Sequence, residues 1–149
     1  MITRFERFLV SLSGITRSWH KIAATELKKY GLKGTYAIYL VTMLRYPEGV
    51  TSASLSDICD RNKADVSRSI SELEKKGLLS REDNRSKYRV LIKLTDEGRE
   101  IAEEVKRSSN IAVEIAGLGI SEEKRQIFYD TMELISSNLQ NLSKKGIPK

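Results

Sequence analysis

The run from residue 63 to residue 75 carries cationic and hydroxyl side chains at the spacing of one helix face. These residues are Lys63, Ser67, Arg68, Ser71 and Lys75. An arginine can donate two hydrogen bonds to guanine O6 and N7, a serine hydroxyl can bond to base edges, and lysines can contact the flanking phosphates. The pattern predicts a helix that reads the major groove of DNA. For this helix alone, a solvated outer face without a ligand is an equally good interpretation.

A second basic cluster lies at a turn a little further along the chain. The turn reads Asn84-Arg85-Ser86-Lys87 and is flanked by segments that suit two short strands. Arg85 and Lys87 on a projecting turn fit the minor groove of DNA, where A·T-rich stretches concentrate negative potential. Asp83 is close enough in sequence to orient Arg85 through a charge-assisted hydrogen bond. A charged hairpin that only resists aggregation is the alternative, but the two basic features together favour DNA binding.

The elements that position these residues are predicted to be a helix-turn-helix and a β-hairpin. A short helix that begins at Thr51 or Ser52 is expected to brace the helix over about 63–76, through a turn at 60–62. The longer helix has an apolar inner face made of Val66, Ile70 and Leu73. Beyond it the apolar period changes to two, from about residue 78 to residue 94, which is typical of paired strands. Together these elements predict a winged helix-turn-helix.

Asn62 and Asp65 stand at the expected start of the longer helix. Their spacing resembles a capping box, in which two side chains accept hydrogen bonds from free backbone N–H groups. An acidic side chain in a first turn also interacts favourably with the helix dipole, whereas it would repel a nearby DNA phosphate. Capping is therefore the preferred interpretation of Asp65, and contact with DNA is the alternative.

Apolar residues at alternating steps of three and four predict long helices at both ends of the chain. The first is expected over about 2–29 and the last from about 121, with another helix from about 95 toward 115. The seams of the two end helices include Phe5, Phe8, Leu12, Ile15, Ile135, Leu139 and Leu142. Such seams fit a homodimer interface, although a monomeric bundle could also bury them. A two-fold dimer would require an inverted repeat in the DNA, with half-sites about 34–36 Å apart per helical turn.

The charge and the apolar content of the chain indicate which class of protein it belongs to. The chain has 149 residues, with 26 Lys and Arg against 20 Asp and Glu, and a net charge of +6. Residues 61–93 contain ten basic and five acidic residues, so the positive charge is concentrated in the middle of the chain. This distribution fits a polyanionic partner. No apolar stretch reaches the ~18 residues of a membrane span, and the start lacks a signal-peptide pattern, which predicts a cytoplasmic protein.

Cysteine and histidine are too scarce for most cofactor and catalytic sites. Cys59 and His20 are single, so an internal disulfide and a Cys/His zinc site are excluded, whereas a site made only of carboxylates stays open. Any histidine-dependent nucleophilic triad would have to use His20. The sequence therefore favours a binding protein that has no cofactor and is not an enzyme.

Five short motifs between residues 55 and 98 carry a resemblance to a known family. They are Leu55-Ser56-Asp57-Ile58, Val66-Ser67-Arg68, Leu73-Glu74-Lys75-Lys76-Gly77-Leu78-Leu79, Asp83-Asn84-Arg85 and Leu94-Thr95-Asp96-Glu97-Gly98. In this combination they resemble the MarR family of bacterial transcriptional regulators. The resemblance implies a mainly α, winged helix-turn-helix protein, with an N-terminal dimerisation helix over 1–34, a DNA-binding domain over 35–98 and C-terminal dimerisation helices over 99–149.

The resemblance also implies a function and residue roles. The protein is expected to regulate transcription by binding a pseudo-palindromic operator in double-stranded DNA as a homodimer, with repression the favoured role and activation the alternative. Ser67 and Arg68 fall on recognition-helix positions, Arg85 on the wing arginine and Asp83 on its orienting carboxylate. Asp65 departs from the family, whose members commonly carry Thr or Ser there. This departure puts base contacts from that corner of the helix in doubt.

A ligand pocket is a further implication of the resemblance. A small aromatic or amphipathic effector is expected between the dimer helices and each winged lobe, and Trp19, His20, Tyr36 and Tyr39 are candidates to line its pocket. Ordinary core or interface packing is the commoner role for such aromatic side chains. The alternative function is a winged-helix adaptor that binds a protein instead of DNA. Such an adaptor would be expected to lack the basic residues of the helix and the hairpin tip.

Overall fold

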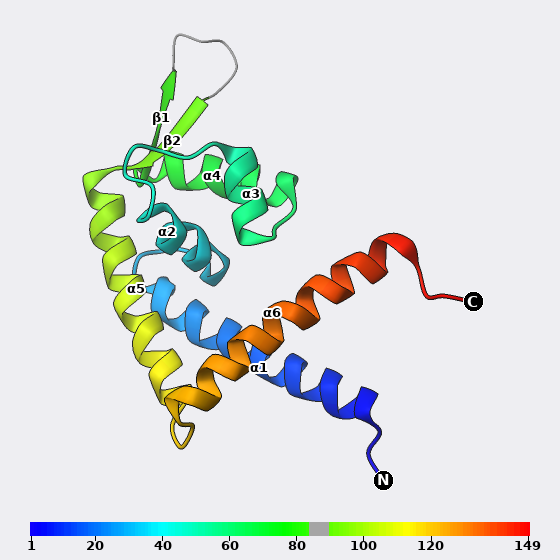
Figure 1. Cartoon of the computed structure of the whole chain (residues 1–149). Coiled ribbons are helices and arrows are strands. Elements are labelled where there is room, and N and C mark those ends of the chain that lie inside the picture. Colours follow the sequence, from blue (N-terminus) through cyan, green and yellow to red (C-terminus); the bar gives the residue numbers. More distant parts are fainter. Residues whose placement is uncertain (84–89) are drawn as a thin grey trace. The chain divides into compact units, whose positions relative to one another are not determined.

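The mainly α chain folds into six α-helices, one 3₁₀ turn and a two-stranded hairpin within the residues described, which are 1–83 and 90–149 of the computed structural model (Figure 1). The elements are α1 (Arg4–Lys28), η1 (Gly34–Tyr36), α2 (Ala37–Met43), α3 (Ser52–Cys59), α4 (Lys63–Lys75), β1 (Leu79–Asp83), β2 (Val90–Leu94), α5 (Asp96–Ala116) and α6 (Glu122–Lys145). The strands are antiparallel, with Leu79 opposite Leu94 and Asp83 opposite Val90. The predicted order of helices, helix-turn-helix and hairpin is confirmed.

The chain forms two compact units, Met1–Asn110 and Ile111–Lys149. The first unit contains α1, the helix-turn-helix, the hairpin and α5 as far as Asn110. Leu27 of α1 and Val105 of α5 belong to the same apolar cluster as the helix-turn-helix. The compact unit therefore extends across the predicted boundaries at 34 and 98, and the dimerisation roles of the two flanking regions stay predictions.

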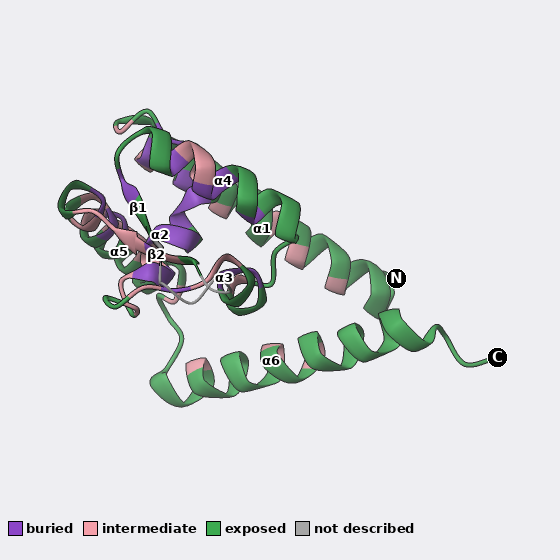
Figure 2. Ribbon diagram, turned by 90° about the horizontal axis from the view of Figure 1, so that it is seen from above, coloured by how far each residue is buried: buried purple, intermediate pink, exposed green. Residues whose placement is uncertain are grey.

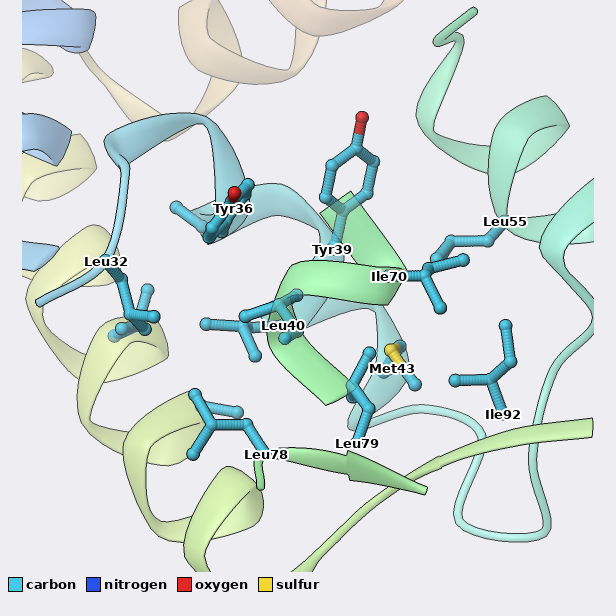
Figure 3. Close-up of a cluster of buried hydrophobic side chains, with 14 of the residues drawn as sticks. Leu32, Tyr36, Tyr39, Leu40, Met43, Leu55, Ile70, Leu78, Leu79 and Ile92 are labelled. Carbon is cyan, nitrogen blue, oxygen red and sulfur yellow. The ribbon is translucent and has the colours of Figure 1, made fainter. Parts of the chain in front are cut away.

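One apolar core holds the first unit together (Figure 3). Its fully enclosed side chains, each exposed by 1% or less, include Leu27, Leu40, Leu55, Val66, Ile70, Leu73, Ile92 and Ala102. Val50 extends the hairpin by one bridge, because it exchanges backbone hydrogen bonds of 3.0 and 2.8 Å with Ile92. The core thus draws on every helix from α1 to α5 and on the hairpin. Figure 2 shows that its buried residues line the inner sides of α4, α2 and the strands.

A close joint connects the end of α4, the hairpin and the start of α5. The Thr95 backbone N–H donates to the carbonyl of Leu78 at 3.0 Å, and the Thr95 hydroxyl donates to the carbonyl of Gly77 at 2.7 Å. The same hydroxyl accepts a hydrogen bond of 3.1 Å from the backbone N–H of Gly98, as a helix cap does. A Cβ on Gly98 would lie 2.0 Å from the carbonyl oxygen of Leu78. This contact explains the Leu-Thr-x-x-Gly motif, since no side chain fits at its last position.

The second unit presents an exposed helix. Ser121 caps α6 by accepting a hydrogen bond from the backbone N–H of Lys124, and Arg125 donates to Glu114 at 2.8 Å and to the Gly117 carbonyl at 3.1 Å. No residue of α6 is buried, and Figure 2 shows it exposed along almost its whole length. Its exposed apolar side chains are Ile127, Phe128, Tyr129, Leu134, Leu139 and Leu142. Across the described ranges, we find no helix with the length and hydropathy of a membrane span.

The joint at Gly98 gives a first prediction. Gly98→Ala should lower the free energy of unfolding by about 2 kcal/mol or more, because the added methyl group overlaps a backbone carbonyl that is held by hydrogen bonds. Urea denaturation followed by circular dichroism measures the change. Gly14→Ala is the matched control, since nothing lies within 4 Å of the added Cβ in helix α1, and it should raise stability by about 0.5–1 kcal/mol. Equal stability of the two variants would contradict the close contact.

Candidate nucleic-acid interface

Helix α4 is held by its inner face and by its start. Val66, Ile70 and Leu73 are exposed by 1% or less, so the rotation of the helix about its axis is fixed by the core. Asn62 caps the helix, because its side-chain oxygen accepts a hydrogen bond of 2.7 Å from the backbone N–H of Ala64. The side of α4 that turns away from the core is therefore determined by local sequence and by packing together.

The turn before α4 is tied to helix α3. The hydroxyl of Ser56 donates to the Arg61 carbonyl at 2.6 Å, and the backbone N–H of Arg61 donates to the Ser56 carbonyl at 3.0 Å. Asp60 adopts the left-handed conformation with φ 48°, which is tolerated by aspartate better than by most residues. Thr51 caps the other end of α3 by accepting a hydrogen bond from Ser54 at 3.1 Å. These contacts fix the angle at which α3 supports α4.

The structure brings together the five residues predicted on the reading face of α4. Lys63, Ser67, Arg68 and Lys75 are exposed, and Ser71 is half-buried. They share the part of the helix surface that is left free by the apolar face. Two lysines, one arginine and two hydroxyl groups on one accessible helix face can donate to phosphates and to base edges.

The predicted wing residues are only partly within the described chain. Strand β1 ends at Asp83 and β2 begins at Val90, so Arg85 and Lys87 lie outside the described residues. The strands that carry them extend beyond α3 and α4 (Figure 1). The roles of Arg85, Lys87 and Asp83 therefore stay predictions.

Asp65 pairs with Arg68, and this corrects the predicted capping box. The carboxylate of Asp65 accepts a hydrogen bond from the guanidinium of Arg68, three residues later on the same helix. Asn62 caps the helix through Ala64, and the structure contains no return bond from Asp65 to the cap backbone. An aspartate is one methylene shorter than a glutamate, so its reach favours the neighbouring guanidinium. The pair places Arg68 beside an acid that an incoming base or phosphate would have to replace.

Two further ion pairs lie near the hairpin. Arg81 donates to Glu74 at 2.6 Å, and Lys93 lies 3.0 Å from Glu82. Each pair connects β-strand residues to α4 or to each other, and each is partly exposed. Surface pairs of this kind contribute only about 0–1 kcal/mol, so their cations can be redirected to phosphate at little cost.

Tyr36, Lys33 and Glu72 form a contact that the sequence analysis did not identify. The Tyr36 hydroxyl donates to the Glu72 carboxylate, and the Lys33 ammonium lies 3.6 Å from the same oxygen, Oε2. Burial, followed by this hydrogen bond, raises the pKa of Tyr36 to about 12, and the bond lowers the pKa of Glu72. The partners are 36 residues apart in sequence, which leaves no local spacing that could reveal them.

The residues predicted to line one ligand pocket are distributed over different places in the first unit. Tyr36 and Tyr39 border a groove of about 350 Å³ that also contacts Arg68 and Glu72 of α4. Trp19 borders a separate hollow of about 10 Å³, room for about one water molecule. His20 is exposed on α1 and borders neither space. In Figure 3 the hydroxyl of Tyr39 points away from Met43, Leu79 and Ile92.

In the described part of the chain, the candidate metal ligands do not cluster and Cys59 lies against Thr42. There, no three or more His, Cys, Asp and Glu side chains gather into a set that could hold a metal ion. The thiol of Cys59 is half-buried and lies 3.5 Å from the Thr42 hydroxyl. This packing is that of a small apolar side chain with a weak hydrogen bond.

Known proteins share this arrangement. Residues 30–89 match a family model described as MarR family. The HTH-type transcriptional regulator YdgJ of Bacillus subtilis (strain 168) is 30% identical over 107 residues, which cover 69% of this chain and 63% of YdgJ. The chain belongs to the MarR family. It spans less than two thirds of the length of YdgJ, and the family model begins just after α1 and includes the helix-turn-helix.

Solved structures of MarR proteins have the same fold over nearly the whole chain. A MarR family transcriptional regulator from Listeria monocytogenes, solved with 26mer DNA, is 25% identical with a TM-score of 0.82, over 95% of this chain and 96% of that one. A MarR protein from Peptoclostridium difficile is 22% identical with a TM-score of 0.85, over 97% and 95% of the two chains. The winged helix-turn-helix fold predicted from the motifs is therefore confirmed.

The hydroxyl of Tyr36 gives a prediction in alkaline solution. Its pKa of about 12 in the folded chain exceeds the ordinary value of 10.0, so its contribution to stability is present below pH 10 and is lost as the pH rises toward 12. The free energy of unfolding should therefore fall more steeply between pH 9 and pH 11.5 in the natural chain than in Tyr36→Phe, as measured by urea denaturation. Parallel curves for the two proteins would contradict the raised pKa of Tyr36.

Proposed function

We propose that this MarR family protein is a sequence-specific transcriptional regulator that binds a pseudo-palindromic operator as a homodimer and acts as a repressor. The observation that carries the proposal is the reading face of α4. Its cations and hydroxyls are accessible, whereas its opposite face is locked in the core by Val66, Ile70 and Leu73. The Listeria relative solved with 26mer DNA supports the same use of the fold.

Dimerisation is supported by apolar side chains that a single chain leaves exposed. On α1, Phe5 is 70% exposed and Ile15 is 59% exposed, and Leu139 on α6 is 47% exposed. Phe8, Leu12 and Ile135 are half-buried, and Leu142 is exposed. Apolar seams of this length mark surfaces for association with another protein. A second copy would cover them by two-fold symmetry and would present two α4 helices to DNA, which is why the operator should be an inverted repeat.

The wing completes the proposed contact with DNA. Strands β1 and β2 extend beyond the helix-turn-helix and lead to the basic tip that contains Arg85 and Lys87. A cationic tip beside a major-groove helix is suited to the adjacent minor groove. We assign the tip to affinity and the α4 face to the choice of sequence.

Release by a small effector is a separate part of the proposal. The groove bordered by Tyr36, Tyr39 and Arg68 has a volume of about 350 Å³, which is within the ~300–1,000 Å³ of small-molecule sites. It combines aromatic walls with cations and with the carboxylates of Asp65 and Glu72, so a small aromatic or amphipathic molecule suits it. A molecule bound beside Arg68 would compete with DNA for the guanidinium.

The rival function is a winged-helix adaptor that binds a protein and no DNA. The accessible Lys63, Arg68 and Lys75 oppose it, because such an adaptor would be expected to have lost the basic residues of this helix. An enzyme is the weaker alternative, and membership of a regulator family supports placing the chain outside the enzymes.

Selection from a library of random duplex DNA tests the proposal directly. The purified chain should enrich an inverted repeat, and fluorescence anisotropy should show tighter binding of the selected duplex than of a shuffled control. The logarithm of the binding constant should fall with the logarithm of salt by about 0.9 for each neutralised phosphate. Light scattering should give the mass of a dimer. Enrichment of no sequence, with no binding at low salt, would favour the adaptor.

Arg68 and Lys75 give a paired prediction on DNA binding. Arg68→Ala should cost about 1–3 kcal/mol on the selected duplex and relax the preference for one base, if its two hydrogen bonds reach one guanine. Lys75→Ala removes an equal charge from the same helix, but it should weaken binding to selected and shuffled duplexes alike. Anisotropy titrations of both variants separate the two roles. The same loss on both duplexes for Arg68→Ala would contradict base readout.

A further inference from the structure

In addition to its apolar face and its ion pair with strand β1, the reading helix α4 has a polar contact with the segment before α2. Glu72 lies four residues after Arg68, one helical turn further along the same side of α4. Its carboxylate accepts the hydrogen bond from Tyr36 and lies 3.6 Å from the Lys33 ammonium. Both partners come from the short segment that joins α1 to α2. The turn of α4 that follows Arg68 is therefore anchored to that segment.

The ring of Tyr36 is held firmly in place, so its hydroxyl is a fixed hydrogen-bond donor to Glu72. Its side chain is 3% exposed and belongs to the apolar core. The segment before it is pressed against α1, since a Cβ on Gly34 would lie 2.6 Å from the backbone nitrogen of Ala24. A hydroxyl on a ring held in this way has little freedom to follow its partner. A shift of Glu72 away from Tyr36 would break the bond, so the bond favours one position of α4 against α1.

Arg68 lies close to the hydrogen bond between Tyr36 and Glu72. Arg68, Asp65, Tyr36 and Glu72 border the same groove. Asp65 holds the guanidinium from one side, and Glu72 holds the following turn of the helix. A guanidinium that must meet two acceptors on one base tolerates a misplacement of only a few tenths of an ångström, because hydrogen bonds weaken steeply with distance and angle. The position of the helix therefore matters more to base readout than to contacts with phosphate.

We propose that Tyr36 and Glu72 are positioning residues for sequence readout: their hydrogen bond sets the reading helix α4 against helix α1. The inference rests on the proposed function and adds two residues that do not touch DNA themselves. Because α1 carries part of the proposed dimer seam, the same bond also fixes α4 with respect to the dimer. It acts on the discrimination between operator and other DNA, and it leaves the general attraction to phosphate unchanged.

The degree to which the protein prefers the selected duplex over the shuffled one distinguishes a positioning role from a merely structural role. The ratio of affinities for the selected and shuffled duplexes should fall by about tenfold in Tyr36→Phe, which corresponds to one hydrogen bond to a charged group. Glu72→Ala also removes a negative charge and should strengthen binding to both duplexes, but its ratio should fall by a similar factor. Glu72→Gln keeps an oxygen acceptor for the hydroxyl and should retain most of the ratio. The double variant Tyr36→Phe, Glu72→Ala should be no worse than either single variant.

Tyr30→Phe is the matched control. It removes one hydroxyl from the chain just after α1, and among the described residues Tyr30 has no hydrogen bond to α4. Its ratio should stay within about twofold of the natural chain, well below the change expected for a lost bond to a charged group. Thermal unfolding of every variant establishes that the compared proteins are folded. Should Tyr36→Phe prove too unstable, the pair Glu72→Ala and Glu72→Gln carries the test, because the Glu72 side chain is 43% exposed.

The outcomes distinguish this inference from the proposed function. A natural chain that discriminates between the duplexes, with folded Tyr36→Phe and Glu72→Ala variants of unchanged ratio, would overturn the positioning role alone. Additive losses in the double variant would overturn it as well, since the residues would then act separately. A natural chain that does not discriminate between the duplexes would overturn both proposals.

Discussion

The burial of one face of α4 is the constraint on which the rest of the first unit depends. Each fully buried Val, Leu or Ile contributes about 1.5–3 kcal/mol, so turning this face out of the core would cost about 4.5–9 kcal/mol, which is comparable to the net stability of a whole domain. Val66, Ile70 and Leu73 therefore fix the rotation of the helix. The polar residues of the same helix have only the remaining arc to occupy. Their convergence into a reading face follows from the apolar pattern, which is why a 13-residue helix can present several donors in one direction.

Local patterns made much of this architecture predictable. The apolar period of α4, its Asn62 cap and the turn before it are all set by residues close together in sequence, and so is the change to a two-residue period in the hairpin. The same patterns predicted the order of elements, and the family motifs agreed with it. The reading face itself required only helix geometry, because residues three and four apart lie on one side whatever they pack against.

Contacts between distant segments could not be predicted in the same way. The Tyr36 and Glu72 bond joins elements whose approach depends on the packing of α1, η1 and α4 together. The two candidate capping boxes show a second limit of prediction from sequence spacing. Thr3 and Glu6 form a complete one at α1, whereas Asn62 and Asp65 have the same spacing and do not. Asp65 is shorter than Glu6 and pairs with the nearby Arg68 instead of the cap backbone. The spacing of the cap residues alone does not predict this competing partner.

The joint at Leu78 has a mechanical consequence. Its carbonyl oxygen holds the first turn of α5 by a hydrogen bond to Thr95 and leaves no space for a methyl group on Gly98. Because this contact leaves no free space, a rotation of the first turn of α5 is transmitted to strand β1. Strand β1 has five residues, a lever of roughly 16 Å at about 3.3 Å for each residue. A tilt of only about 5° at the joint would therefore displace the far end of that strand by roughly 1.4 Å, about half the length of a hydrogen bond.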